Sequence, residues 1–175
     1  MTQHIEPIEV VAYNPDWPRW FDAERDRLLQ VLGVVAVRID HIGSTAVPGL
    51  AAKPVIDILA IVEPFPLPPA LIAGVESLDY EFKGEYGIVG RQYFRTRPHA
   101  RHLHVFAPGS LEVGRHLLFR DYLRSHPEAA REYGTLKRRL AAEHRRNREA
   151  YTDGKAGLVR AILERAGAEA TTERS

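Results

Sequence analysis

The stretch HIGSTAVPGLAAKPVIDI, residues 41–58, contains two turns followed by an apolar run with a single carboxylate, Asp57. The run 54–62 has apolar residues in both phases of a two-residue alternation, which is typical of a strand covered on both faces. An ionised carboxylate in such a strand costs free energy unless it is paired, hydrogen-bonded or bound to a metal ion. Asp57 is therefore the first candidate for a functional residue.

Gly43 and Ser44 form the first turn, where a predicted strand at 34–42 ends. Such a pair exposes backbone amides and lets a ligand approach closely, so it is compatible with phosphate binding as well as with an ordinary turn. Ser44 and Asp57 are separated by 12 residues. The turn and the carboxylate can therefore meet at one edge of a sheet, and this spacing favours a phosphate site.

The composition excludes several classes of protein. The 175 residues contain no cysteine, so that disulfides, thiolate nucleophiles and cysteine-based zinc sites are excluded, and any metal must be held by histidine, carboxylate or water. No apolar run approaches the roughly 20 residues needed to span a bilayer. The N-terminus lacks the pattern of a secretory signal, so we expect a cytoplasmic protein with no membrane partner. The net charge of +1 gives no general attraction to nucleic acid, which we do not expect as a partner.

The hydrophobic pattern predicts an α/β (α+β) fold with a mixed β-sheet flanked by helices and a helical C-terminal segment from about residue 111. We expect one domain over 1–167 and a flexible tail over 168–175. The pattern does not predict the oligomeric state. The predicted strands are 8–13, 34–42, 55–62, 80–83, 92–97 and 102–106. The predicted helices begin near Asn14-Pro15, Ala70 and Leu111, with a break at His126-Pro127, and continue over 128–148 and 154–166.

Several blocks of the chain resemble the GrpB family, a branch of the nucleotidyltransferase-fold superfamily. The blocks are His41 to Leu50, Lys53-Pro54, Ile56 to Ile58, Glu85 to Arg91, Tyr93-Phe94, His102 to Phe106 and His116 to Pro127. The resemblance implies a nucleotidyltransferase-like sheet in which Gly43, Ser44 and Thr45 hold nucleotide phosphates. It also implies that Asp57 is a catalytic ligand of a divalent metal, Mg or Mn, during attack on the α-phosphate. Such chemistry needs positioning and charge neutralisation more than covalent help from the protein.

The acidic residues depart from the superfamily pattern. A second metal carboxylate usually follows two positions after the first, where this chain has Leu59, and His102-Leu103-His104 occupies the expected place of a third acid. Alternation along a strand places His102 and His104 on one face. With Asp57 they could form a two-histidine, one-carboxylate site for Mn, Fe, Ni or Zn. Alternatively, they are hydrogen-bonded groups that orient Asp57 or a phosphate.

The remaining candidates support these residues. His41 and His99 are further candidate members of the site, and Glu85 could replace the missing acid or bond to its own loop. Lys53, Arg91 and Arg95 are candidates for phosphate binding. The alternative for Lys53 is a structural ion pair with an acid. The alternative for the arginine face, which also carries Tyr93, is a solvated charged strand. The basic helix over 137–148 also carries glutamates, which indicates a solvated face.

Three functions are consistent with these residues. The first is a metal-dependent nucleotidyltransferase that transfers a nucleotidyl group from a nucleoside triphosphate to a small-molecule acceptor. The second is a nucleotide- or phosphometabolite-binding module without catalysis, because Leu59 replaces an acid. The third is a hydrolase with one metal held by Asp57, His102 and His104. The sequence identifies neither the acceptor nor the nucleotide.

Overall fold

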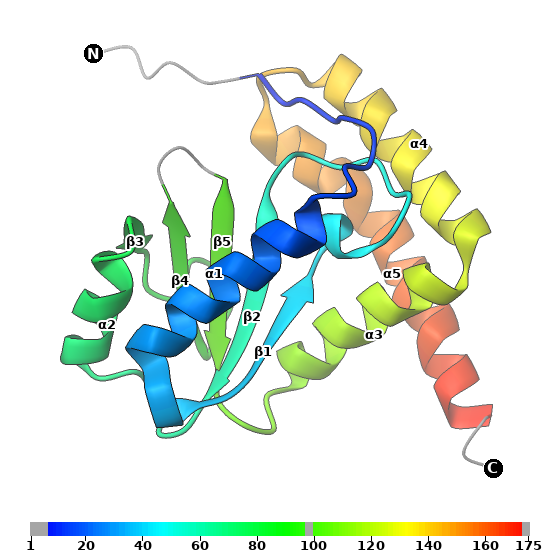
Figure 1. The fold of residues 1–175 in the computed structure, drawn as a ribbon. Helices are drawn as coiled ribbons and strands as arrows, with labels where there is room; N and C mark the ends of the chain where they lie inside the picture. The colour runs from blue at the N-terminus through cyan, green and yellow to red at the C-terminus, as the bar shows by residue number, and fades with distance from the viewer. Residues whose placement is uncertain (1–6, 97–99, 173–175) are drawn as a thin grey trace.

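The computed structural model describes residues 7–96 and 100–172, and Figure 1 shows a sheet between two groups of helices. Five strands follow the order β1-β2-β5-β4-β3, in which β2 and β5 are parallel and the other neighbours antiparallel. The mixed sheet predicted from the sequence is therefore present. The strands are β1 (Ala36–Ile42), β2 (Ile56–Val62), β3 (Tyr80–Phe82), β4 (Arg91–Thr96) and β5 (Arg101–Phe106). The helices are α1 (Trp17–Leu32), α2 (Pro69–Glu76), α3 (Leu111–Ser125), α4 (Pro127–Glu143) and α5 (Arg148–Thr172), with short turns η1 (Gly33–Val35) and η2 (Ser44–Ala46).

The two faces of the sheet are buried by different helices. On one face, apolar residues of the central strands, such as Ile58 and Leu103, pack against Trp17 and Leu28 of α1 and Val75 of α2. On the other face, a smaller cluster packs against α3; it consists of Ile42, Leu59 and Phe106. Because both faces are covered, the central strand β2 is apolar in both phases, as its sequence predicts.

The helical back of the molecule, formed by α3, α4 and α5, builds a core of its own. Tyr122 and Leu123 of α3, Tyr133 of α4 and Ile162 of α5 pack together with Val47 from the segment after β1. Figure 1 shows these three helices grouped on the side of the sheet away from α2, with α5 running beside α4. This arrangement leaves the C-terminal helices facing the turn after β1.

The observed elements differ from the predicted ones at both ends of the chain. Residues 8–13 do not form a strand, because Val11 makes an isolated bridge with Ala52 and no further ladder follows. The helix predicted to run to 148 ends at Glu143, and the next one begins at Arg148. The tail predicted from 168 is helical through Thr172, since buried Ile162 and Ala166 anchor α5. Predicted strand residue 97 lies outside the described part of the chain.

Candidate functional site

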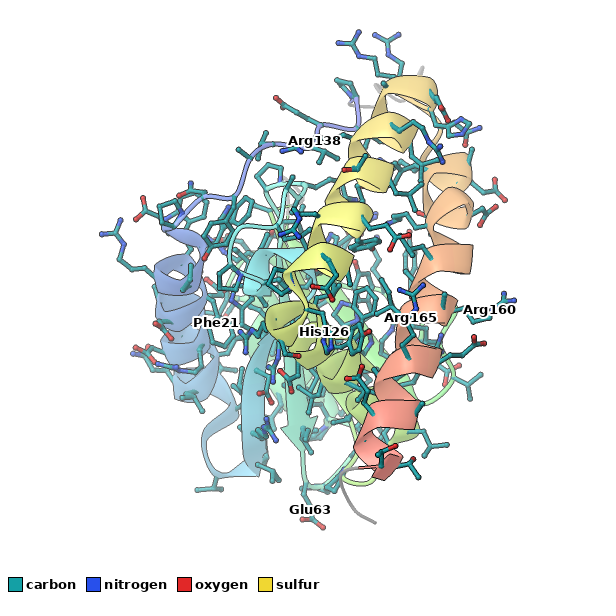
Figure 2. The ribbon with its side chains drawn as sticks, turned by 90° about the vertical axis from the view of Figure 1, so that its right-hand side faces the viewer. Phe21, Glu63, His126, Arg138, Arg160 and Arg165 are labelled. Atoms are coloured by element: carbon teal, nitrogen blue, oxygen red, sulfur yellow. The ribbon has the colours of Figure 1, made fainter. Side chains whose placement is uncertain are left out.

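A cleft of about 590 Å³ lies between one face of the sheet and the helical back. The turn after β1 contributes Gly43, Ser44 and Thr45, and the central strands contribute Asp57, His102 and His104. The approach to β2 contributes Lys53. The helices contribute the other wall, with Glu112, Arg115, His116 and Phe119 from α3, Tyr133 and Lys137 from α4, and Tyr151, Thr152, Lys155, Val159 and Leu163 from α5. In Figure 2, α4 and α5 lie in front of the sheet and close this side of the molecule.

Gly43 and Asp57 are in direct contact across the β1–β2 ladder. The register pairs Ile42 with Asp57, which places the turn next to the carboxylate. Gly43 has a φ of +71°, and a Cβ atom at this position would lie 2.5 Å from Asp57 Oδ2. A glycine is thus required both by the backbone conformation and by the close approach. The predicted meeting of the turn with the carboxylate is present.

Asp57 faces two imidazoles from the neighbouring parallel strand. His102 Nδ1 lies 3.1 Å from Asp57 Oδ1, within hydrogen-bond distance, and His104 Nε2 lies 3.8 Å from the same oxygen. Burial opposes ionisation of Asp57, but the hydrogen bonds and the attraction of the two histidines outweigh it, and the pKa of this carboxyl is held well below its usual range. The Asp57 side chain, 28% exposed, is therefore a carboxylate that faces the cleft.

Arg91 determines how His104 is protonated. Its guanidinium lies 3.1 Å from His104 Nδ1 and also donates to the carbonyl oxygens of Glu85 and Tyr86. A guanidinium has donors and no acceptor, so His104 Nδ1 must accept, and the proton of the neutral ring sits on Nε2. Burial, together with neighbouring Arg91 and His102, lowers the pKa of His104 against the opposing effect of Asp57, which keeps the ring neutral. His104 thus turns an N–H toward Asp57.

These protonation states do not fit the two-histidine, one-carboxylate metal site. A histidine ligates a metal through a nitrogen lone pair, and the nitrogen of His104 that faces Asp57 carries a proton instead. Among the residues that the structure describes, no group of three or more histidine and acidic side chains is arranged to hold a metal ion. The geometry favours the alternative expectation, in which both histidines orient Asp57 through N–H groups.

Among the described residues, no second acid lies beside Asp57 on the sheet side of the cleft. Leu59, two positions later, is fully buried and packs with Ile42 and Phe106. Glu85 accepts the backbone N–H of Gly90 through Oε1, so it bonds to its own loop and does not replace the missing carboxylate. Within the described ranges, the other acid that lines the cleft is Glu112 of α3, whose side chain is 3.4 Å from Arg115.

Several predicted site residues lie outside the cleft. The His41 ring stacks on Phe21 of α1 and its Nε2 is 2.9 Å from Thr45 Oγ1, so it supports the turn from the opposite face of the sheet. Figure 2 shows Phe21 on the side of the molecule away from α5. Tyr93 contacts the edges of both imidazoles behind the site, and the Arg95 guanidinium lies over the Tyr86 ring. The position of His99 falls in the gap between the described ranges.

The prediction of a solvated face over 137–148 is wrong at Lys137. This side chain of α4 is only 2% exposed, and its Nζ donates a 2.7 Å hydrogen bond to Ser44 Oγ. The Tyr133 hydroxyl, one turn earlier on α4, is hydrogen-bonded to Ser44 as well. Burial, and then repulsion by Lys155, lowers the pKa of Lys137 to about 7, against a smaller opposing effect of Asp57. Its place in the buried stripe of α4, four residues after Tyr133 and three before Leu140, is the sequence signal that could have identified it.

Two more lysines share the cleft. The ammonium groups of Lys155 and Lys53 lie 4.4 and 5.6 Å from the centre of the Tyr151 ring, so this ring contacts both of them. Burial, and then repulsion by Lys53, lowers the pKa of Lys155 to about 8. The cleft is thus lined by three lysines, and Asp57 is the carboxylate that the sheet contributes to it.

The family of the chain follows from comparison with known sequences. The sequence model described as GrpB protein matches residues 7–165. The chain belongs to the GrpB family. UPF0157 protein YqkA of Bacillus subtilis (strain 168) is 40% identical over 168 residues, which cover 93% of this chain and 49% of that protein. The chain therefore spans about half the length of this relative.

Solved structures show that this GrpB chain shares its fold with nucleotidyltransferases. The crystal structure of conserved protein GrpB from Enterococcus faecalis superposes with a TM-score of 0.86 at 40% identity, covering 90% of this chain and 96% of that one. The structure of the GLD-2/RNP-8 complex gives a TM-score of 0.55 at 12% identity, covering 85% of this chain and 58% of that one. The latter similarity shows the fold alone, and it confirms the predicted nucleotidyltransferase-like architecture.

Within the described ranges, no helix combines the length and the apolar composition that crossing a bilayer would require.

Proposed function

We propose that the cleft binds the phosphate groups of a nucleotide or another phosphorylated metabolite. The observation that carries this proposal is the position of Lys137, whose buried ammonium group contacts Ser44 of the turn and forms no ion pair with a carboxylate of the described residues. An isolated cation in such a site is costly unless a ligand of opposite charge joins it. A phosphate group beside Ser44 would supply that charge.

The other cations of the cleft extend this argument. Lys53 and Lys155 line the same cleft as Lys137. After burial, repulsion by Lys155 and Lys53 lowers the pKa of Lys137, and repulsion by Lys53 lowers the pKa of Lys155. A phosphate bound at Lys53 and Lys155 offsets this repulsion, because an anion favours the charged form of each amine that it contacts. Arg91 and Arg95 do not line the cleft, so in this proposal the lysines replace these two arginines as the phosphate ligands.

Nucleotidyl transfer to a small acceptor is the second candidate. It is favoured by the placement of Asp57, because its Oδ2 atom faces Gly43 and accepts no hydrogen bond from the described residues. Magnesium is commonly held by one or two carboxylates together with substrate phosphates, and in this role it would neutralise charge on the phosphate. A hydrolase with one transition metal is not proposed, because His104 turns a proton toward Asp57.

A thermal-shift panel tests phosphate binding. Inorganic phosphate, pyrophosphate and the nucleoside di- and triphosphates, each with and without Mg²⁺, are added to the purified chain. A ligand at about 100 times its dissociation constant stabilises the native state by about 2.7 kcal/mol. We expect stabilisation by at least one phosphate compound, which Lys155→Gln weakens and Arg139→Gln, on the exposed face of α4, does not. Absence of any response would contradict the proposal.

The same panel separates binding from transfer. If Asp57 holds a metal, Asp57→Asn abolishes the additional stabilisation by Mg²⁺ and leaves stabilisation by the metal-free nucleotide in place. If Mg²⁺ adds nothing in the wild-type chain, the binding module without catalysis is the better description.

A further inference from the structure

We propose that Ser44 and Lys137 form a nucleophile–base pair that reacts with carbonyl esters or thioesters carrying a phosphate or carboxylate group. This activity goes beyond phosphate binding, and only the choice of an anionic substrate rests on the proposed function. The inference rests on two contacts of the Ser44 hydroxyl group and on the charges around Lys137, which are described below. None of them is needed to hold a metal ion.

The first contact is between the two reacting side chains. Lys137 Nζ and Ser44 Oγ are 2.7 Å apart, which is the distance over which a base takes a proton from a serine nucleophile. The contact is long-range in sequence, since 93 positions separate the two residues. Lys137 is held by the packing of α4, and Ser44 begins the short turn η2 that follows β1.

The second contact involves Tyr133. Its side chain is hydrogen-bonded to Ser44, and burial raises the pKa of this phenol above its usual range, so that it keeps its proton. The Tyr133 ring also lies 4.6 Å from Lys137 Nζ and limits where the amine can move.

The third observation is the electrostatic setting of Lys137. The charged groups that face it are Lys155 of α5, Lys53 before β2, Asp57 of β2 and its neighbour Arg138 on α4. Burial and these mostly positive neighbours lower the pKa of Lys137 to about 7, so a substantial fraction of the amine is neutral near neutral pH. Lysine–serine pairs of this kind need the neutral amine, because an ammonium group has no lone pair.

The step is balanced without a cofactor. Ser44 Oγ attacks the carbonyl carbon while Lys137 Nζ takes the hydroxyl proton, and the bond to the leaving alcohol or thiol then breaks as Lys137 returns that proton to it. In the second half, Lys137 takes a proton from water, whose oxygen attacks the acyl carbon, and returns that proton to Ser44 Oγ as the bond to the serine breaks and the acid leaves. Lys53 and Lys155 line the same cleft and would hold the anionic group of the substrate.

The first test uses a fluorophosphonate probe and intact-mass and peptide analysis of the purified chain. The expected result is one adduct, on Ser44, which is absent in Ser44→Ala.

Lys137→Arg keeps the charge and the hydrogen-bonding capacity but supplies no neutral amine, and general-base catalysis typically contributes about 100-fold or more to a rate. We therefore expect Lys137→Arg to slow labelling about 100-fold, and the wild-type rate to rise with pH around a midpoint near 7. Arg139→Gln should label like the wild type. An unlabelled Ser44 in the folded chain, or equal rates in Lys137→Arg, would overturn the proposal.

The second test uses the absence of cysteine from the chain. In Ser44→Cys the single thiol should be alkylated by iodoacetamide at pH 7 faster than the thiol of Ser77→Cys, which is placed on an exposed helix end. Adding Lys137→Met to Ser44→Cys should remove this advantage, because a nearby lysine lowers a thiol pKa. Equal rates at the two positions would contradict the inferred environment of Ser44. Neither test depends on phosphate binding, whose failure would appear in the thermal-shift panel instead.

Discussion

Asp57 keeps its charge in an apolar strand because two imidazoles of the neighbouring strand face it. His102 donates to it directly, and Arg91 forces His104 to direct an N–H at the same oxygen. The sequence indicated that this carboxylate needed partners, and it named both histidines. It could not indicate their tautomers, since these depend on Arg91, which lies opposite Phe106 at the far end of the β4–β5 ladder.

The tautomer of His104 can be measured. Because Arg91 occupies Nδ1, we expect the Nε2–H form between pH 6 and 8 in ¹⁵N-correlated NMR spectra of the imidazole. In Arg91→Met the constraint is absent and both tautomers become accessible. A wild-type ring with its proton on Nδ1 would show that the guanidinium does not control it, and it would return the two-histidine metal site to consideration.

The contact between Gly43 and Asp57 predicts a specific effect of a methyl group. Gly43→Ala places a Cβ atom 2.5 Å from Asp57 Oδ2 at a φ of +71°. Gly109→Ala is the matched control, because it has a φ of +78° and no heavy atom within 4 Å. The left-handed conformation alone costs about 1–2 kcal/mol, and overpacking adds about 1–3 kcal/mol. Chemical denaturation should therefore show a larger loss of stability for Gly43→Ala, and equal losses would contradict the observed contact.

The burial of His41 predicts that the protein loses part of its folding stability at acidic pH. Burial lowers the pKa of His41 to about 4, from 6.5 in the unfolded chain, with Arg124 and Arg120 adding to the effect and Asp57 opposing it. The unfolded state therefore binds the extra proton first, and stability is lost as pH falls from 6.5 to 4. His41→Gln removes this titration, so its stability relative to the wild type should rise by up to roughly 3 kcal/mol over that interval. Parallel pH profiles of the two proteins would contradict this assignment.

At the scale of elements, most helices and strands could be predicted because each has its own periodicity. The break at His126-Pro127 was predicted from proline, and α4 begins there. The prediction of a strand over 8–13 is wrong, because within the described residues this segment pairs only through one β-bridge, between Val11 and Ala52. The prediction of a flexible tail after 167 is wrong through Thr172, because the buried residues Ile162 and Ala166, and not the local glycine, determine how far α5 extends.

The anchoring of α5 can be tested at Ile162. This side chain is fully buried among residues of α3 and α4, so Ile162→Ala should lower the free energy of unfolding by about 2–5 kcal/mol. Ile162→Val, which removes one methyl group, should cost about 0.5–1.5 kcal/mol. Urea denaturation checks both values. A loss below 1 kcal/mol for Ile162→Ala would show that α5 is not anchored there.

At the scale of the whole molecule, the cleft exists because the helical back faces the turn after β1. Gly43, Ser44 and Asp57 lie within one short stretch and could be identified from the sequence. Lys137 and Lys155 could not be assigned to the same place, because no local pattern reports which helix packs over which turn. The periodicity of α4 indicated that Lys137 is buried, but it did not indicate that Ser44 is its hydrogen-bond partner.

The central claim, that these helices supply the phosphate ligands, is tested most directly by isothermal titration calorimetry with pyrophosphate and nucleoside triphosphates. We predict measurable binding to the wild-type chain and an unchanged affinity in Arg139→Gln. In Lys155→Gln the affinity should be at least tenfold weaker, which corresponds to a loss of about 1.4 kcal/mol in binding free energy. Binding that is unaffected by Lys155→Gln, or lost equally in Arg139→Gln, would contradict this account.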